Sequence, residues 1–133
     1  MTIPLTQPYA KNTFATDVNP MVAKAGKNEV MEFKNLCGLL VVNLKGSEKV
    51  KTVSLAAYDD TGALARIAGP HFVNLDYESE PLLSVIQEGE QYAQGNMITM
   101  DCGEGVQINP SVATPFHFVL APGEYSKISV IVT

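Results

Sequence analysis

The sequence predicts an all-β fold, a β-sandwich of about seven or more mostly antiparallel strands. Three observations predict it. Apolar and polar residues alternate over short segments, Gly and Pro separate those segments, and apolar residues nowhere recur at helical spacing over several turns. A length of 133 residues is enough for one domain with its own core.

The composition is that of a globular protein, with 46% apolar and 17% charged residues and a net charge of −5. Arg66 and the few Lys form no basic stripe, so nucleic acid is not an expected partner. No apolar run is long enough to span a bilayer, so no transmembrane segment is expected. Because the start has neither a basic region nor a long apolar one, we expect a cytoplasmic chain or a trimmed form of an exported protein.

The first 28 residues are expected to be irregular, because Pro4, Pro8, Pro20 and Gly26 interrupt them. Within them, the weakly alternating residues 2–6 predict an edge strand, where Pro is tolerated. The sandwich itself is expected over residues 29–133.

The longest apolar run extends from Phe33 to Gly46 and is rich in Val and Leu. Such a run predicts a central core strand that is buried on both faces. Strands are therefore expected over residues 29–36 and 37–44. After a turn at Gly46, residues 50–58 predict a strand with one inward face, formed by Val53, Leu55 and Ala57.

Turn-forming residues separate the remaining strands. Asp59-Asp60-Thr61-Gly62 predicts an exposed hairpin tip, and Gly103-Glu104-Gly105 is expected to end a strand. Residues 88–95 are polar and predict a loop. In order, the predicted strands are residues 63–67, 72–77 (with Val73, Leu75 and Tyr77 on one face), 82–87, 97–102, 106–108, 116–120 and 128–132.

No spacing typical of a catalytic, phosphate-binding or metal-binding motif occurs. His117 lies between two Phe residues and is expected to point away from them, toward solvent. A zinc site made of Cys37, Cys102, His71 and His117 is disfavoured, because none of the ligands is paired locally. We therefore predict no catalytic residue, no metal site and no cofactor.

Cys37 and Cys102 each precede a Gly at the edge of a predicted strand. Two alternatives stay open. A disulfide would close a loop of 102 − 37 = 65 residues and contribute roughly 4 kcal/mol by chain-entropy arguments. Alternatively, both residues are free thiols in a packed core.

Five segments of the sequence carry a resemblance to a known family. They are residues 19–23 (NPMVA), 33–46 (FKNLCGLLVVNLKG), 50–55 (VKTVSL), 100–107 (MDCGEGVQ) and 116–125 (FHFVLAPGEY). Together they resemble the amino-terminal domain of fimbrillin-like surface proteins of the Bacteroidetes. This resemblance implies a transthyretin-like β-sandwich, exported as a lipoprotein and used as a pilus subunit or a cell-surface adhesin domain. In that family, subunits polymerise by strand exchange.

The resemblance implies a non-enzymatic module located at the outer membrane or in a fimbrium. Its expected partners are neighbouring subunits or a host receptor, and glycan is a further expected ligand class. Members usually carry a second sandwich, so this chain is expected to be one domain of a longer protein, or a module of a phage or other surface assembly. The alternative is a glycan-binding accessory domain of a surface lipoprotein. The absence of Trp disfavours it, because sugar sites usually need an exposed aromatic platform.

Two segments are candidates for strand exchange, because an open sheet edge can template another strand. Both are expected to be poorly committed to the core. The first is the strand before the long loop, with Thr2, Ile3 and Leu5. The second is the terminal segment, whose alternating Ile128, Val130 and Val132 can bury one apolar face in a groove.

Overall fold

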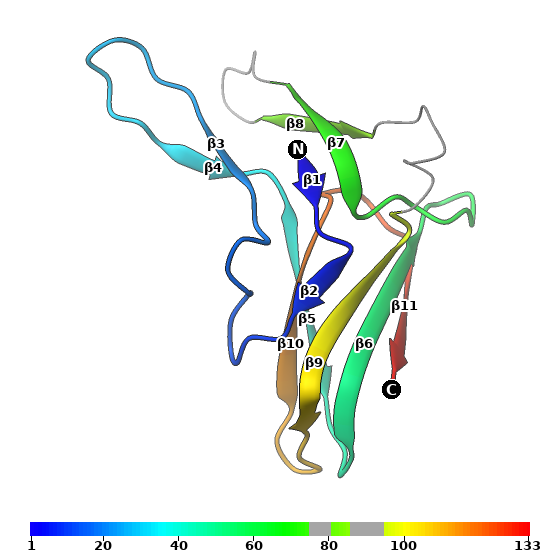
Figure 1. Ribbon diagram of the computed structural model, residues 1–133. Helices are drawn as coiled ribbons and strands as arrows, with labels where there is room; N and C mark the ends of the chain where they lie inside the picture. The colour runs from blue at the N-terminus through cyan, green and yellow to red at the C-terminus, as the bar shows by residue number, and fades with distance from the viewer. Residues whose placement is uncertain (75–80, 86–94) are drawn as a thin grey trace.

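The computed structural model describes residues 1–74, 81–85 and 95–133. Over these residues the chain forms eleven strands and no helix, and the prediction of an all-β, mostly antiparallel, sandwich-like fold is confirmed (Figure 1). This part of the chain accordingly contains no helix of the length and apolarity needed to cross a membrane. The strands are β1 (Thr2–Ile3), β2 (Thr6–Pro8), β3 (Met21–Ala23), β4 (Phe33–Asn35), β5 (Gly38–Leu44), β6 (Lys49–Tyr58), β7 (Gly69–Asn74), β8 (Leu82–Val85), β9 (Met97–Gln107), β10 (Thr114–Leu120) and β11 (Lys127–Val132).

Two sheets enclose the core. The larger has four strands in the order β11–β6–β9–β2, and the smaller pairs β10 with β5. In Figure 1 the smaller sheet lies behind the larger one, and β1, β7 and β8 form a separate three-stranded sheet above both. The fully buried side chains between the layers come from alternate positions of these strands, and they include Val53, Leu55, Ile98, Met100, Phe116 and Phe118.

The strand predicted at residues 50–58 is confirmed as β6, and its neighbour β9 lies beside it at the centre of the larger sheet. Val53, Leu55 and Ala57 of β6 are buried, as the alternation predicts. The predicted strands near residues 116–120 and 128–132 are likewise confirmed as β10 and β11.

The prediction of a central, doubly buried strand within residues 33–46 is wrong. Of the described strands, only β10 pairs with β5, so β5 is an edge strand. Its Leu40, Val42 and Leu44 pack against the core, whereas Leu39 and Val41 on the other face are among the exposed large apolar residues. The run is apolar on both sides, yet its outer face has no covering layer in the described structure.

The predicted strand end at Gly103 to Gly105 is also wrong, because β9 continues through both glycines to Gln107. Gly103 and Gly105 have φ angles of 58° and 111°. Between Thr52 opposite Asp101 and Val50 opposite Val106, the register shifts, so these glycines form an irregularity inside one strand. The strands predicted at 97–102 and 106–108 are therefore one.

The hairpin tip after β6 is confirmed. Oδ1 of Asp59 accepts hydrogen bonds from the backbone N–H groups of Thr61 and Ala63, at 2.9 and 3.0 Å, and Gly62 has a φ of 85°. The return strand predicted at 63–67 is wrong, because this segment contributes a single isolated bridge, from Leu64 to Tyr58.

Some predictions lie partly or wholly outside the described residues. Of the strand predicted at 72–77, residues up to Asn74 belong to β7, and Leu75 and Tyr77 fall outside. Of the strand at 82–87, β8 covers Leu82–Val85. The loop predicted at 88–95 is described only at Gly95.

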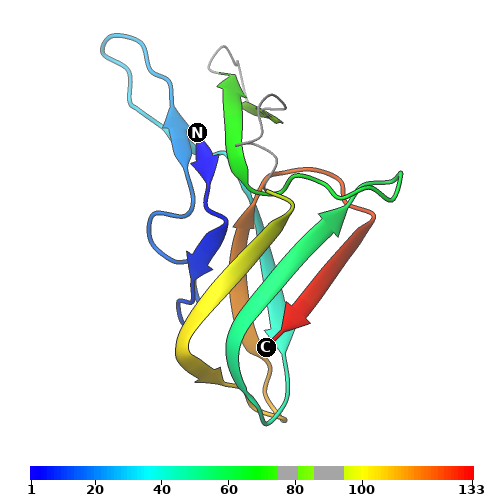
Figure 2. The ribbon, with the colours of Figure 1, turned by 45° about the vertical axis from the view of Figure 1, so that its right-hand side comes forward.

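Residues 1–28 are more ordered than predicted, since they contain β1, β2 and β3. The edge strand predicted at residues 2–6 is instead two short strands in different sheets. The predicted strand at 29–36 is only β4, which pairs with β3. These two form a hairpin that projects away from the sandwich in both ribbon views (Figures 1 and 2), and we call residues 21–35 the arm.

Candidate functional site

The feature that stands out in the described structure is the way the first strands are built into the sandwich. β2 is one of the two edge strands of the larger sheet and runs parallel to β9, with Gln7 opposite Met100. Backbone hydrogen bonds at both ends of β2 hold it there: Thr99 N donates to Leu5 O and Tyr9 N donates to Asp101 O, both at 2.9 Å. Pro8 is accommodated because an edge strand has one unpaired side.

The side chain of Gln7 joins β2 to the opposite sheet. It is 1% exposed. Its Oε1 accepts a hydrogen bond from Val119 N at 3.0 Å, and its Nε2 donates to Val119 O at 2.7 Å and to Pro4 O at 3.2 Å. One amide side chain thus pairs with both backbone groups of a β10 residue, as a neighbouring strand would do. β2 and Gln7 together close this side of the sandwich.

Three apolar contacts hold the same N-terminal segment. Ile3 is fully buried in the core, and β1 pairs with β7. The Tyr9 ring lies 5.3 Å from that of Phe116, and the Phe14 ring meets His117 edge-on at 5.0 Å. The segment is therefore anchored in the core at Ile3 and by the rings of Tyr9 and Phe14, and the expectation that it is poorly committed to the core is wrong.

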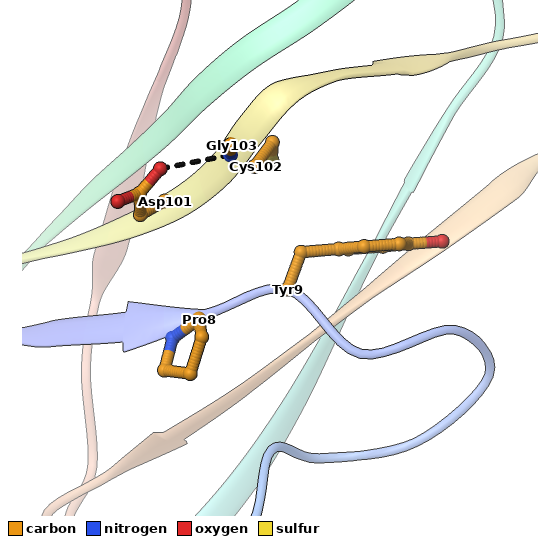
Figure 3. A pocket seen from close by; sticks show the side chains of 5 residues that line it. All are labelled: Pro8, Tyr9, Asp101, Cys102 and Gly103. Atoms are coloured by element: carbon orange, nitrogen blue, oxygen red, sulfur yellow. Dashed lines mark hydrogen bonds between the residues drawn. The ribbon is translucent and has the colours of Figure 1, made fainter.

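A shallow hollow of about 330 Å³ lies at the end of β2 (Figure 3). It is lined by Pro8 and Tyr9 on one side and by Asp101, Cys102 and Gly103 of β9 on the other. The Asp101 carboxylate does not point freely into it, because Oδ1 accepts a hydrogen bond from Gly103 N at 2.8 Å. In Figure 3 the Tyr9 ring extends away from this pair, so the polar groups do not converge on one point.

Both cysteines are free thiols, so the disulfide alternative is not found in the structure. Cys37 directly precedes β5 of the smaller sheet, whereas Cys102 lies within β9 of the larger sheet.

Neither thiol is activated as a nucleophile. Burial raises the pKa of Cys37 to about 11. Burial, with a smaller contribution from the negative charge of Asp101, also raises the pKa of Cys102. A nucleophilic cysteine needs the opposite, a lowered pKa or an adjacent base. Among the described residues, no three His, Cys, Asp or Glu side chains are grouped so that they can hold a metal ion.

The two histidines have structural positions. His71 is buried, and its Nδ1 lies 3.0 Å from Gly69 O, which requires the proton on Nδ1. His117 points away from the buried Phe116 and Phe118, as predicted, but it does not face open solvent. The Phe14 ring covers it, and its Nδ1 is buried without a hydrogen-bond partner.

The predicted strand-exchange residues do not come together. Thr2 is exposed on β1, Ile3 is in the core, and Leu5 is half-buried between β1 and β2. Ile128, Val130 and Val132 lie on β11, and the order β11–β6–β9–β2 places that strand at the opposite edge of the sheet from β2. Sequence reasoning missed Gln7. The signal available was its place in the alternation after Ile3 and Leu5, at a position where an inward side chain is expected.

Comparisons with protein-family models, with curated proteins and with solved structures found no match.

Proposed function

We propose that this chain is a non-enzymatic structural or adhesive module of the cell surface, a transthyretin-like sandwich that resembles a subunit domain of fimbrillin-like pili. The observation that supports this proposal most is the position of β2. This short strand lies at the edge of the larger sheet and is joined by Gln7 to the smaller one. It fills the position between the edges of the two sheets that an exchanged strand would occupy.

Strand exchange is the assembly mode that fits this geometry. Removing β2 would leave the outer edge of β9 unpaired and would strip Val119 of the hydrogen bonds that Gln7 provides. Buried backbone groups without partners are unfavourable, so the groove would favour a new strand. A strand from a neighbouring subunit gains affinity from backbone hydrogen bonds and register from alternate side-chain pockets.

The chemistry of the polar groups supports a non-enzymatic role. The thiols of Cys37 and Cys102 have raised pKa values, and the Asp101 carboxylate is bonded to the backbone. The shallow hollow at β2 therefore offers no nucleophile with a positioned base. The partners of this module are neighbouring subunits or a surface receptor, and its location is the exterior of the cell, in keeping with the resemblance.

A chain that lacks residues 1–11 tests the proposal. We expect a lower melting temperature than that of the intact chain, because Ile3 and Gln7 are lost. We also expect a synthetic peptide of residues 1–11 to bind the shortened chain and raise its melting temperature again. A peptide of residues 126–133 tests whether the terminal segment fills the same groove.

The matched control is the 1–11 peptide with Gln7→Ala, which should bind more weakly because it cannot pair with Val119. If the shortened chain cannot be purified in folded form, it is refolded in the presence of each peptide. A shortened chain that remains a folded monomer with unchanged thermal stability, and that binds neither peptide, would show strand exchange at this end to be wrong.

A further inference from the structure

The two sides of the sandwich are closed to different degrees. On one side, Gln7 of β2 joins the larger sheet to β10 of the smaller one, and Pro8 has no N–H group with which to bond a further strand. On the other side, β5 and β11 are the outer strands of their sheets, and no described strand pairs with their outer edges (Figure 2). An edge strand with unpaired backbone groups can template another strand.

Hydrogen bonds show which backbone groups of β11 are free. Thr133 and Thr52 exchange both of their backbone bonds, at 3.0 and 3.1 Å. In an antiparallel ladder, residues that bond the neighbouring strand alternate with residues whose N–H and C=O groups point to the other edge. The register of β11 with β6 is unbroken, so this alternation runs through the whole strand. It directs the N–H and C=O groups of Ile128, Val130 and Val132 to the open edge.

β11 has none of the features that usually protect an edge strand. Residues 127–133 include no Pro and no Gly, and Lys127 at the start is their one charged side chain. The side chains of Ile128, Val130 and Val132 lie opposite buried residues of β6 and so point to the core side of the sheet. They are nevertheless 38%, 40% and 44% exposed. A strand placed along this edge would cover part of that apolar surface.

The same edge of a second copy fits β11 in antiparallel register. A two-fold axis through Val130 places this residue opposite its own copy and places Ile128 opposite Val132 in both directions. These are the three positions whose backbone groups are free, so each pair can exchange two hydrogen bonds. Each paired position also carries a β-branched apolar residue, which favours strand structure. The edge is therefore self-complementary, as a two-fold contact requires.

The charges around β11 favour the antiparallel direction over the parallel one. Acidic residues gather at the start of the strand: Ser126 donates a hydrogen bond to Asp59 O, and it lines one hollow with Asp60 and Glu124. Parallel pairing would bring these groups of the two copies side by side. The antiparallel register separates them, and separates Lys127 from its copy, by six residues or about 20 Å. That distance is well beyond the screening length of about 8 Å at physiological salt.

We propose that two copies of this chain associate through β11, with the two strands antiparallel about Val130, so that their larger sheets join into one continuous sheet. Because both copies use the same surface, the contact closes as a dimer and does not continue into a filament. It uses neither β1 nor β2 and so goes beyond the strand exchange proposed above. Either contact can fail without the other.

Opposite charges at residue 130 test this register. Val130→Lys and Val130→Glu each put like charges opposite one another at the two-fold axis, which disfavours the dimer of either variant. An equimolar mixture of the two puts opposite charges there. The matched control is a mixture of Ile128→Lys and Ile128→Glu, on the same face and similarly exposed. Residue 128 and its copy lie four residues apart along the strands, or about 13 Å, so salt screens their interaction.

Sedimentation velocity over a concentration series measures the association, and circular dichroism checks that each variant is folded. The intact chain is expected to show a reversible equilibrium between monomer and dimer. Val130→Lys and Val130→Glu alone should each lower the association constant at least about tenfold, and their mixture should recover most of this loss. The mixture of the two Ile128 variants should associate as weakly as each variant alone.

If a charge at either position prevents folding, Val130→Cys and Ile128→Cys replace the charged variants. Opposite residues that exchange hydrogen bonds have Cα atoms about 5.5 Å apart, which is within the range of a disulfide. With oxidised glutathione as the oxidant, Val130→Cys should give a covalent dimer on a non-reducing gel, whereas Ile128→Cys should give much less.

Four outcomes would overturn the inference. The intact chain stays monomeric up to about 1 mM. The mixture of the two residue-130 variants associates no better than either variant alone. The mixture of the two residue-128 variants recovers association as well as the residue-130 mixture does. Or the two cysteine variants cross-link equally.

Discussion

Replacing Gln7 by Ala is expected to destabilise the fold far more than the loss of one polar side chain on the surface. The substitution leaves Val119 N–H and Val119 C=O without partners in a buried site. Each buried unpaired group costs about 1–3 kcal/mol, so the two together predict a loss of roughly 3 kcal/mol in the free energy of unfolding. Against a typical total of about 5–15 kcal/mol, this is a large fraction.

Gln107→Ala is the matched control, because the side chain of Gln107 also makes three hydrogen bonds to the backbone, in its case all donated to carbonyl oxygens. That residue is exposed, so water replaces the lost bonds. We expect its free energy of unfolding to fall by less than about 1 kcal/mol. Urea unfolding followed by circular dichroism measures both values. If the two variants lose the same stability, the bridging role assigned to Gln7 is wrong.

Gln7→Glu separates the acceptor from the donors of the bridge. The new carboxylate keeps the acceptor for Val119 N–H, but it faces Val119 O and Pro4 O, which also accept. Burial and these two oxygens would raise the pKa of the carboxyl group above its unfolded value of about 4.3. Its neutral form donates, so the stability of this variant should be highest below the unfolded pKa and should fall as the pH rises through the folded pKa. A variant whose stability relative to the intact chain is independent of pH would contradict this account.

Further predictions concern a thiol and two glycines. Burial raises the pKa of the Cys37 thiol to about 11 from 9.0, so the unfolded chain loses this proton first. The free energy of unfolding should therefore fall as the pH rises from 9.0 to about 11. Cys37→Ser should show a smaller fall when both proteins are unfolded in urea across the same pH range, because burial also raises the pKa values of Cys102 and Tyr125. Gly95→Ala should lower the free energy of unfolding strongly, because a Cβ there would lie 2.5 Å from Ala68 O at a φ of 136°. Gly62→Ala, with a φ of 85° and open space around it, should lower it by only about 1 kcal/mol. Equal melting temperatures of the two variants would refute this difference.

The local sequence pattern was sufficient to predict the structure where the alternation of apolar and polar residues within one segment determines which side chains are buried. In β6 the inward residues Val53, Leu55 and Ala57 occupy alternate positions, and the structure buries all three as predicted. The Asp59 turn was also predictable, because its side chain satisfies backbone groups only two and four residues away. Both cases depend on neighbours in sequence.

The local sequence pattern failed to predict the structure where a partner far away in the sequence determines strand pairing or a side-chain contact. Nothing within β5 says that only one of its edges is paired, so an apolar run was mistaken for a doubly buried strand. Gly103 and Gly105 were interpreted as a strand end, although they allow β9 to keep its pairing with β6 through an irregularity. Gln7 and Val119 are 112 residues apart, so a polar residue in an N-terminal segment gave no sign of its partner.

The anchoring of the first strand bears on how the proposed exchange would begin. To leave its place between β9 and β10, the first-strand segment must expose Ile3, break the hydrogen bonds of Gln7 to Val119 and separate the Tyr9 ring from Phe116. Burial of one Ile contributes about 1.5–3 kcal/mol and the bridge roughly 3 kcal/mol, so spontaneous release is rare at equilibrium. An incoming strand therefore competes with a well-bound intramolecular one. If the proposed exchange operates, it requires a step that detaches or removes the first strand, and the chain before that step keeps its groove closed.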